Sequence, residues 1–222
     1  MESKISASMM CSHLVDLKDT IAVFEKEKID YLHIDMMDGD FVPNFGLGTD
    51  YIRGLRELTT IPLDLHLMIS NPEYKFPWIG IKESDLVSIH YESTTQVQRA
   101  LDWLSKYGCK KFLAINPATP IWCLEEVLDY IDGINLLMVN PGFAGQKIVA
   151  STLEKASRLK KFLSEKGKEN IDLEVDGNIT YEHGNQLKKI GANIFVAGTS
   201  SIFKGKVDSF SKNIHLLREA IK

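Results

Sequence analysis

Short apolar runs rich in β-branched residues alternate along the chain with longer stretches whose apolar residues recur at helical spacing. Between residues 70 and 84 the pattern is unclear, because Pro72 and Pro77 limit any helix there. Eight of the short runs predict strands, over residues 4–9, 31–36, 63–67, 86–90, 111–115, 134–139, 171–175 and 193–197. Five of the longer stretches predict helices, over residues 15–28, 50–58, 95–107, 152–166 and 181–190.

This alternation is typical of α/β proteins in which helices join parallel strands. Eight such strands in 222 residues favour a closed (β/α)8 barrel, the TIM barrel. The rival is a doubly wound open sheet, which usually has fewer strands and would not gather several strand ends around one point. Since no linker or low-complexity stretch interrupts the sequence, residues 1–222 are expected to form a single barrel domain.

The composition and charge of the chain argue against nucleic-acid and membrane partners. The chain is 44% hydrophobic and 25% charged, and its formal charge of -4 gives no reason to expect nucleic acid or an acidic membrane. Residues 1–8 are too short and polar for a signal peptide, and no apolar run reaches membrane-spanning length, so we expect a cytoplasmic protein. Cys11, Cys109 and Cys123 lack metal-ligand spacing and are interpreted as reduced thiols.

Metal-capable side chains cluster at predicted strand ends. His33 and Asp35 are two residues apart and therefore share one face of the second strand. His66 ends the third strand and Asp176 follows the seventh. One histidine at a strand end is more often structural, but four such residues on the same barrel rim favour a metal site. Two imidazoles and two carboxylates suit zinc, iron(II), manganese or cobalt rather than calcium.

The two aspartates also suggest acid/base chemistry. The second and seventh strands lie three steps apart around an eight-stranded ring, so Asp35 and Asp176 would face each other with a substrate between them. Inversion of a carbon needs a base on one face and an acid on the other. Because a carboxylate is a weak base for a proton beside a ketone, a divalent cation would be needed to stabilise the enediolate. Met37 and Met68 would form a water-poor wall.

Phosphate binding is predicted from glycine turns rather than from lysines. Backbone N–H groups of the late loops of a barrel commonly bind phosphate, and one such loop could close over the substrate. The turns follow the sixth, seventh and eighth strands and comprise Gly142, Phe143, Ala144, Gly145 and Gln146; Gly177 and Asn178; and Gly198, Thr199 and Ser200.

Together these segments resemble the ribulose-phosphate 3-epimerase family from Ile5 to Phe203. The resemblance is carried by residues 33–44 (HIDMMDGDFVPN), 64–68 (DLHLM) with 71–72 (NP), 116–120 (NPATP), 140–146 (NPGFAGQ) and 175–177 (VDG). It implies a (β/α)8 fold and one divalent metal ion held by His33, Asp35, His66 and Asp176. It also implies that Asp35 and Asp176 form the acid/base pair. Residues implied to contact substrate or phosphate are Ser8, His66, Gly145, Gly177, Gly198 and Thr199.

Departures from the family concern the pocket rather than the metal. Leu137 stands where the family usually has a third methionine of the hydrophobic wall, with Met138 next to it. Asn178 replaces a common second glycine. Residues 6–11 and 143–145 are also similar to the allulose-6-phosphate 3-epimerase branch.

The leading prediction is therefore a metal-dependent epimerase that interconverts D-ribulose 5-phosphate and D-xylulose 5-phosphate. The close alternative converts D-allulose 6-phosphate to D-fructose 6-phosphate. A non-catalytic sugar-phosphate-binding barrel is disfavoured because binding alone needs no opposed carboxylates. Other phosphate-binding barrel enzymes typically use a rim lysine, and no strand here ends in one. The sequence leaves the oligomeric state open, and a homo-oligomer is suggested by analogy with the family alone.

Overall fold

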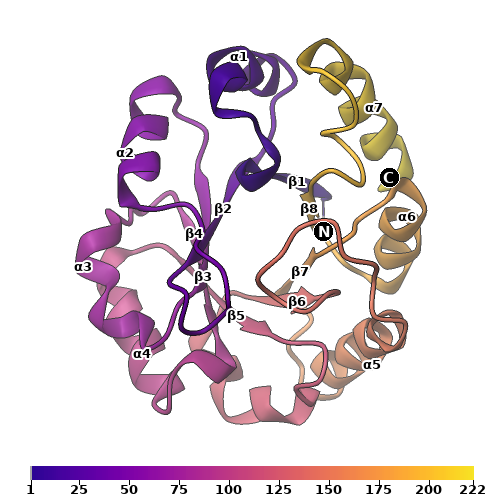
Figure 1. The fold of residues 1–222 in the computed structure, drawn as a ribbon. Helices are drawn as coiled ribbons and strands as arrows, with labels where there is room; N and C mark the ends of the chain where they lie inside the picture. The colour runs from indigo at the N-terminus through magenta and orange to yellow at the C-terminus, as the bar shows by residue number, and fades with distance from the viewer. Residues whose placement is uncertain (1) are drawn as a thin grey trace.

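Eight parallel strands close into a barrel in the order β1 to β8, and helices surround them (Figure 1). The computed structural model describes residues 2–222. The predicted (β/α)8 barrel is thereby confirmed, and an open sheet is excluded because β1 pairs with both β2 and β8. The strands are β1 (Lys4–Ser8), β2 (Tyr31–Met37), β3 (Leu63–Met68), β4 (Leu86–His90), β5 (Lys110–Ile115), β6 (Gly133–Leu137), β7 (Asp172–Asp176) and β8 (Ile194–Ala197).

The five predicted helices match observed helices to within a few residues, and the structure adds further helical elements. A ten-residue 3-10 helix, η6 (Ile121–Tyr130), covers the step from β5 to β6, and α7 is absent from the predicted helices although its buried residues have helical spacing. Between residues 70 and 84, the two prolines each stand near the start of a short element, η3 (Pro72–Tyr74) or α3 (Phe76–Ile79). The longer helices are α1 (Leu17–Lys26), α2 (Thr49–Leu58), α4 (Val97–Leu104), α5 (Ser151–Glu165), α6 (Tyr181–Ile190) and α7 (Phe210–Ala220).

The interior of the barrel is layered. Near the amino ends of the strands, a small apolar cluster of Tyr31, Leu86, Phe112 and Ile194 fills the barrel. Gly133 on β6 makes room for it, since a Cβ atom there would lie 2.2 Å from the Phe112 ring. Above this cluster the interior becomes polar, and that change marks the end of the barrel where a site can form.

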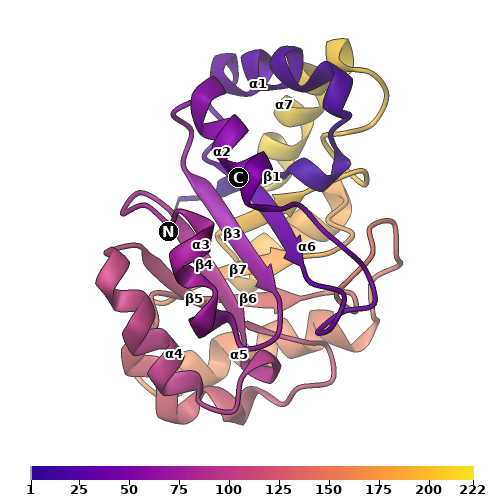
Figure 2. The same ribbon diagram turned by 60° about the vertical axis from the view of Figure 1, so that its left-hand side comes forward.

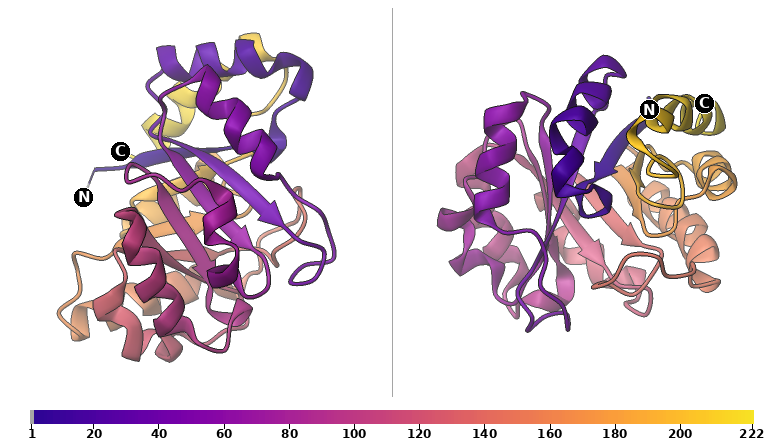
Figure 3. Two further views of the ribbon diagram at one scale, coloured as in Figure 1. Left: turned by 90° about the vertical axis from the view of Figure 1, so that its left-hand side faces the viewer. Right: turned by 45° about the horizontal axis from the view of Figure 1, so that its top comes forward.

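All strands point toward one end of the barrel, where the loops after β2 and β6 lie side by side (Figures 2 and 3). Asn44 of the first loop donates a hydrogen bond from Nδ2 to the Gly142 carbonyl of the second, at 2.7 Å. The chain ends lie together, with the Ser3 hydroxyl donating to the Ile221 carbonyl. None of the helices in the described part of the chain has the length and apolar composition that a bilayer span requires.

Candidate active site

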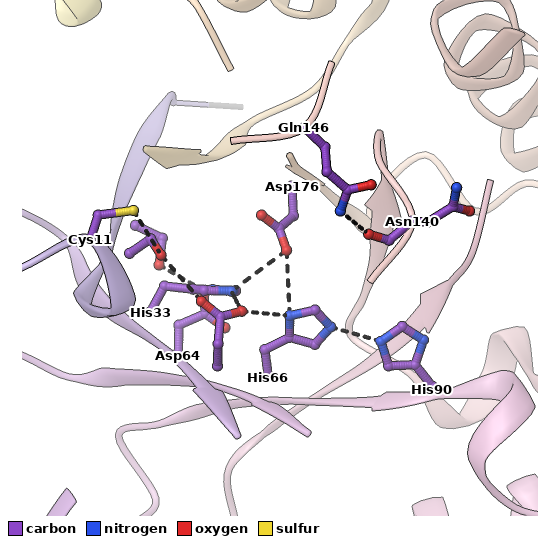
Figure 4. Close-up of polar contacts among 11 residues, drawn as sticks. Cys11, His33, Asp64, His66, His90, Asn140, Gln146 and Asp176 are labelled. Carbon is purple, nitrogen blue, oxygen red and sulfur yellow. Dashed lines mark hydrogen bonds and ion pairs between the residues drawn. The ribbon is translucent and has the colours of Figure 1, made fainter. Parts of the chain in front are cut away.

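Four predicted side chains converge at the carboxyl end of the barrel (Figure 4). Asp35 Oδ1 lies 3.3 Å from His33 Nε2 and 3.3 Å from His66 Nδ1. Asp176 Oδ2 lies 3.6 Å and 3.3 Å from the same two nitrogens. The four ligand atoms lie within 4.8 Å of one another. Strands β2, β3 and β7 thus bring two imidazoles and two carboxylates to one point.

Strand pairing explains this convergence. In the pairing of β2 with β3, Asp35 is the partner of His66 and His33 is the partner of Asp64. Alternation along each strand then directs both side chains of a pair into the barrel. Asp176 is the last residue of β7 and reaches the same point from across the ring.

The buried Asp64 carboxylate fixes the orientation of the His33 ring. Its Nδ1 lies 2.5 Å from Asp64 Oδ2, which also accepts a hydrogen bond from the Ser6 hydroxyl at 2.6 Å. All three side chains are fully buried. The Asp64 carboxylate accepts a hydrogen bond from Nδ1–H of His33. In the neutral ring, the lone pair of Nε2 is then available on the side that faces Asp35 and Asp176.

The charges of the cluster are strongly coupled. Burial alone would lower the pKa of His33, but the Asp64 and Asp35 carboxylates outweigh burial and raise this pKa well above its usual value. Burial likewise opposes the rise in the pKa of His66, which Asp176 and Asp35 produce. Burial would raise the pKa of Asp35, yet His33 and His66 hold it far below its ordinary range. The two carboxylates thus make the surroundings of both imidazoles negative, which favours a proton or a cation at this point.

The four side chains could hold a metal ion. His33 Nε2 and His66 Nδ1 are buried and have no hydrogen-bond partner among the described residues, although each faces two carboxylate oxygens. Unpartnered buried nitrogens are costly, and coordination of a cation would satisfy both. Zinc, iron(II), manganese and cobalt all accept two imidazoles and two carboxylates.

A pocket opens directly above this cluster. Asp35 and Asp176 line it, with side chains 9% and 15% exposed, whereas His33 and His66 are fully buried beneath them. Other predicted residues that line it are Ser8, Met37, Met68, Leu137, Gly142, Phe143, Ala144, Gly145, Gly177, Asn178, Gly198 and Thr199. The Ser8 hydroxyl donates to Asp35 Oδ2 at 3.1 Å.

The predicted hydrophobic wall lies on one side of this pocket. Met37 and Met68 are almost fully buried and form a cluster with Val42, and the partly buried Met10 packs against it. Leu137 is also buried and lines the pocket from β6. These side chains place low-polarity surface beside the two aspartates.

Amide side chains brace the loop after β6 and join it to the turn after β7. Gln146 donates from Nε2 to the Asn140 and Phe143 carbonyls, at 2.6 and 2.9 Å, and its own carbonyl accepts from Asn178 Nδ2 at 2.6 Å. Asn178 has φ of 53°, a left-handed conformation that asparagine tolerates better than most residues. This explains how Asn178 can stand where glycine is common. The adjacent Gly177 is obligatory, because a Cβ atom there would lie 2.6 Å from Val139.

The sequence analysis missed the polar residues directly below the cluster. Asp64 and Glu174 are fully buried, and each lies two residues before a predicted metal ligand on the same strand. Burial and the neighbouring Asp64 carboxylate raise the pKa of Glu174 well above its usual value. This shift favours the protonated form of Glu174, which can donate a hydrogen bond to Asp64. The two-residue spacing is the signal that could have revealed them.

Sequence comparison extends this picture. A profile of the ribulose-phosphate 3 epimerase family matches residues 4–203. A ribulose-phosphate 3-epimerase of Bacillus subtilis (strain 168) is 36% identical over 197 residues, covering 89% of this chain and 91% of that protein. The chloroplastic ribulose-5-phosphate-3-epimerase of Arabidopsis thaliana is 38% identical over 204 residues, covering 91% of this chain and 72% of that protein.

Solved structures that resemble the chain at low identity support the fold alone. The 3-hexulose-6-phosphate synthase of Salmonella typhimurium superposes with a TM-score of 0.72 at 9% identity, covering 98% of both chains. KGPDC from Streptococcus mutans superposes with a TM-score of 0.69 at 11% identity, covering 100% of this chain and 98% of its own. With the family profile and the sequence relatives, the resemblance noted in the sequence is confirmed: this chain belongs to the ribulose-phosphate 3-epimerase family and is an isomerase.

Proposed function

We propose that the chain is a metal-dependent epimerase that interconverts D-ribulose 5-phosphate and D-xylulose 5-phosphate by moving a proton at carbon 3. The observation that carries this proposal is the meeting of Asp35 and Asp176. They come from strands three steps apart in the closed barrel and line the same pocket. Two carboxylates from opposite sides are what inversion at one carbon needs.

In this proposal each aspartate serves one face of carbon 3. One removes the proton from one face of the substrate, and the other, protonated, returns a proton to the opposite face. In the reverse reaction the roles are exchanged. Ser8 donates a hydrogen bond to Asp35 and thereby fixes the orientation of its carboxylate. Asp176 stands at the end of β7 before the Gly177 turn, with its side chain open to the pocket.

A divalent cation held by His33, Asp35, His66 and Asp176 would stabilise the negative charge of an enediolate, an effect of several kcal/mol. The donor set supports this, since the free nitrogen of each imidazole faces two carboxylate oxygens. Met37, Met68 and Leu137 would restrict water around the reacting carbon.

The substrate phosphate is assigned to the turns after β6, β7 and β8. Among the described residues that line the pocket, none is lysine or arginine. We therefore assign the phosphate to uncharged donors, namely backbone N–H groups of these turns and hydroxyl groups such as that of Thr199. The bonds made by Gln146 and Asn178 hold two of these turns together and so support a preformed phosphate site.

The test is a kinetic assay of the purified, metal-loaded protein with D-ribulose 5-phosphate and, separately, with D-allulose 6-phosphate. We expect faster epimerisation of the five-carbon sugar and loss of the reaction after chelation, with recovery on adding back a divalent metal. Faster epimerisation of the six-carbon sugar would show that D-allulose 6-phosphate is the substrate and that the chemistry is the same. Binding of both sugars without turnover by either, metal present, would contradict the proposal and leave a sugar-phosphate-binding barrel.

A further inference from the structure

A chain of hydrogen bonds leads from the metal-capable cluster to the rim of the barrel. His66 Nε2 lies 2.8 Å from His90 Nε2, and the rings stack with centroids 5.0 Å apart (Figure 4). His90 Nδ1 lies 3.2 Å from Glu92 Oε2. The side chains of His66 and His90 are fully buried, so the contact between the two rings is closed to water, whereas the Glu92 side chain is 23% exposed.

Glu92 is itself held in place by the loop after β5. Its Oε1 accepts hydrogen bonds from the Asn116 backbone N–H, at 2.9 Å, and from the Thr119 hydroxyl. The loop is fastened from the other side by Lys155 of α5, which is 4% exposed and donates to the Asn116 carbonyl at 2.7 Å. Residues 116–120, which the proposed reaction does not use, thus have a place in the architecture.

This geometry allows one consistent placement of protons. The Glu92 carboxylate can only accept, so Nδ1 of His90 carries its proton. Nε2 of the neutral His90 ring is then an acceptor, and Nε2 of His66 must be the donor. The remaining nitrogen of His66, Nδ1, faces Asp35 and Asp176. It is therefore the nitrogen left to bind a cation.

We infer that His90 and Glu92 are positioning residues that fix the ring tautomer of His66 and so present its Nδ1 to the metal. This inference rests on the proposed metal centre. It concerns how the ligand is oriented rather than which residues bind. Outer hydrogen-bond partners of metal-binding histidines commonly change metal affinity by about 10- to 100-fold. The Asp64 carboxylate orients His33 directly, whereas the Glu92 carboxylate would orient His66 through His90.

The first test determines which nitrogen of each histidine ring carries a proton. Long-range ¹H–¹⁵N NMR spectra of the labelled protein distinguish the protonated nitrogen of each ring. We expect the proton of His90 on Nδ1 and a proton of His66 on Nε2, in metal-free and metal-loaded protein alike. A His90 ring protonated on Nε2 alone would overturn the inference. Because it needs no metal, this reading stands even if the proposed metal centre fails.

The second test measures cobalt(II) affinity by competition with a coloured chelator. We expect Glu92→Ala to bind cobalt about tenfold more weakly than the wild type. Glu92→Gln should lose less affinity than Glu92→Ala, because its amide oxygen can still accept the hydrogen bond from His90, although its NH2 group then faces the Asn116 N–H. The matched control is Glu126→Ala, which removes an exposed carboxylate from η6 and should leave affinity unchanged. Equal cobalt affinity in Glu92→Ala and the control would overturn the positioning role. Failure of the wild type to bind cobalt would instead count against the metal centre.

Discussion

Two pairs of carboxylates lie beside His33, one above the other, and they differ in access. Asp35 and Asp176 line the pocket, whereas Asp64 and Glu174 have no exposed surface. The imidazoles hold the pKa of Asp35 far below its usual range, while burial holds the pKa of Glu174 well above it. Carboxylates therefore line the pocket in one pair and are enclosed beneath it in the other, where burial favours the protonated form of Glu174.

The largest effect is expected from Asp176→Asn, in the pair that lines the pocket. We expect kcat to fall about 10³-fold, because the amide can neither take nor give the proton. Binding of inorganic phosphate, measured by calorimetry, should persist. The control is Asp172→Asn at the other end of β7, where the carboxylate accepts from Asn193 Nδ2 at 2.7 Å. Turnover near that of the wild type in Asp176→Asn would refute the two-base account.

In the buried pair, Asp64→Asn should change the orientation of His33 and leave the proton-transfer groups themselves intact. Loss of the charged acceptor should weaken cobalt binding about tenfold. It should also lower the free energy of unfolding by about 2 kcal/mol, as expected for a buried hydrogen bond to a charged group. Chelator competition and urea denaturation measure the two effects. If neither changes, Asp64 does not orient His33.

Glu174→Gln replaces the buried carboxyl group of the second pair with a neutral amide of the same shape. Because the raised pKa favours the uncharged form of Glu174, we expect kcat to change less than about twofold and the unfolding free energy to stay within about 1 kcal/mol. Parallel assay with Asp64→Asn provides the contrast. A kcat loss as large as that of Asp176→Asn would show that Glu174 takes part in the proton transfer.

Asp38, in the loop after β2, is a carboxylate in a third environment, and its replacement is expected to have the smallest effect. Partial burial would raise its pKa, but hydrogen bonds from Lys75 and from the backbone N–H groups of Phe41, Ser70 and Asp40 lower the pKa to about 2. The carboxylate should therefore stabilise the fold above pH 3.8, and this contribution should vanish as the pH falls toward 2.

We expect Asp38→Asn to lose about 1 kcal/mol of unfolding free energy at pH 7, a value reduced for solvent screening. At pH 2 the variant and the wild type should be nearly equal in stability. Denaturant titrations at the two pH values make the comparison. A difference that grows toward low pH would have the wrong sign for a carboxylate with a lowered pKa.

Hydrophobic periodicity was sufficient to predict the barrel, because alternating apolar runs and amphipathic stretches are local signals. His33, Asp35, His66 and Asp176 could be grouped because parallel strands end on one rim. The roles of Asp64 and Glu174 could not be read from their types, since only burial distinguishes their carboxylates from those in the pocket. The contact between His66 and His90 depends on ring orientations that sequence does not encode locally.

Deuterium exchange at carbon 3 tests the central claim most directly, namely that Asp35 and Asp176 each serve one face of the substrate. Metal-loaded wild type, incubated with D-ribulose 5-phosphate in heavy water, should place deuterium at carbon 3 of both epimers. Asp176→Asn, with its metal content checked, should exchange one epimer without inverting it and leave the other untouched. Exchange into both epimers by this variant would contradict the account, because a single remaining carboxylate would then be reaching both faces.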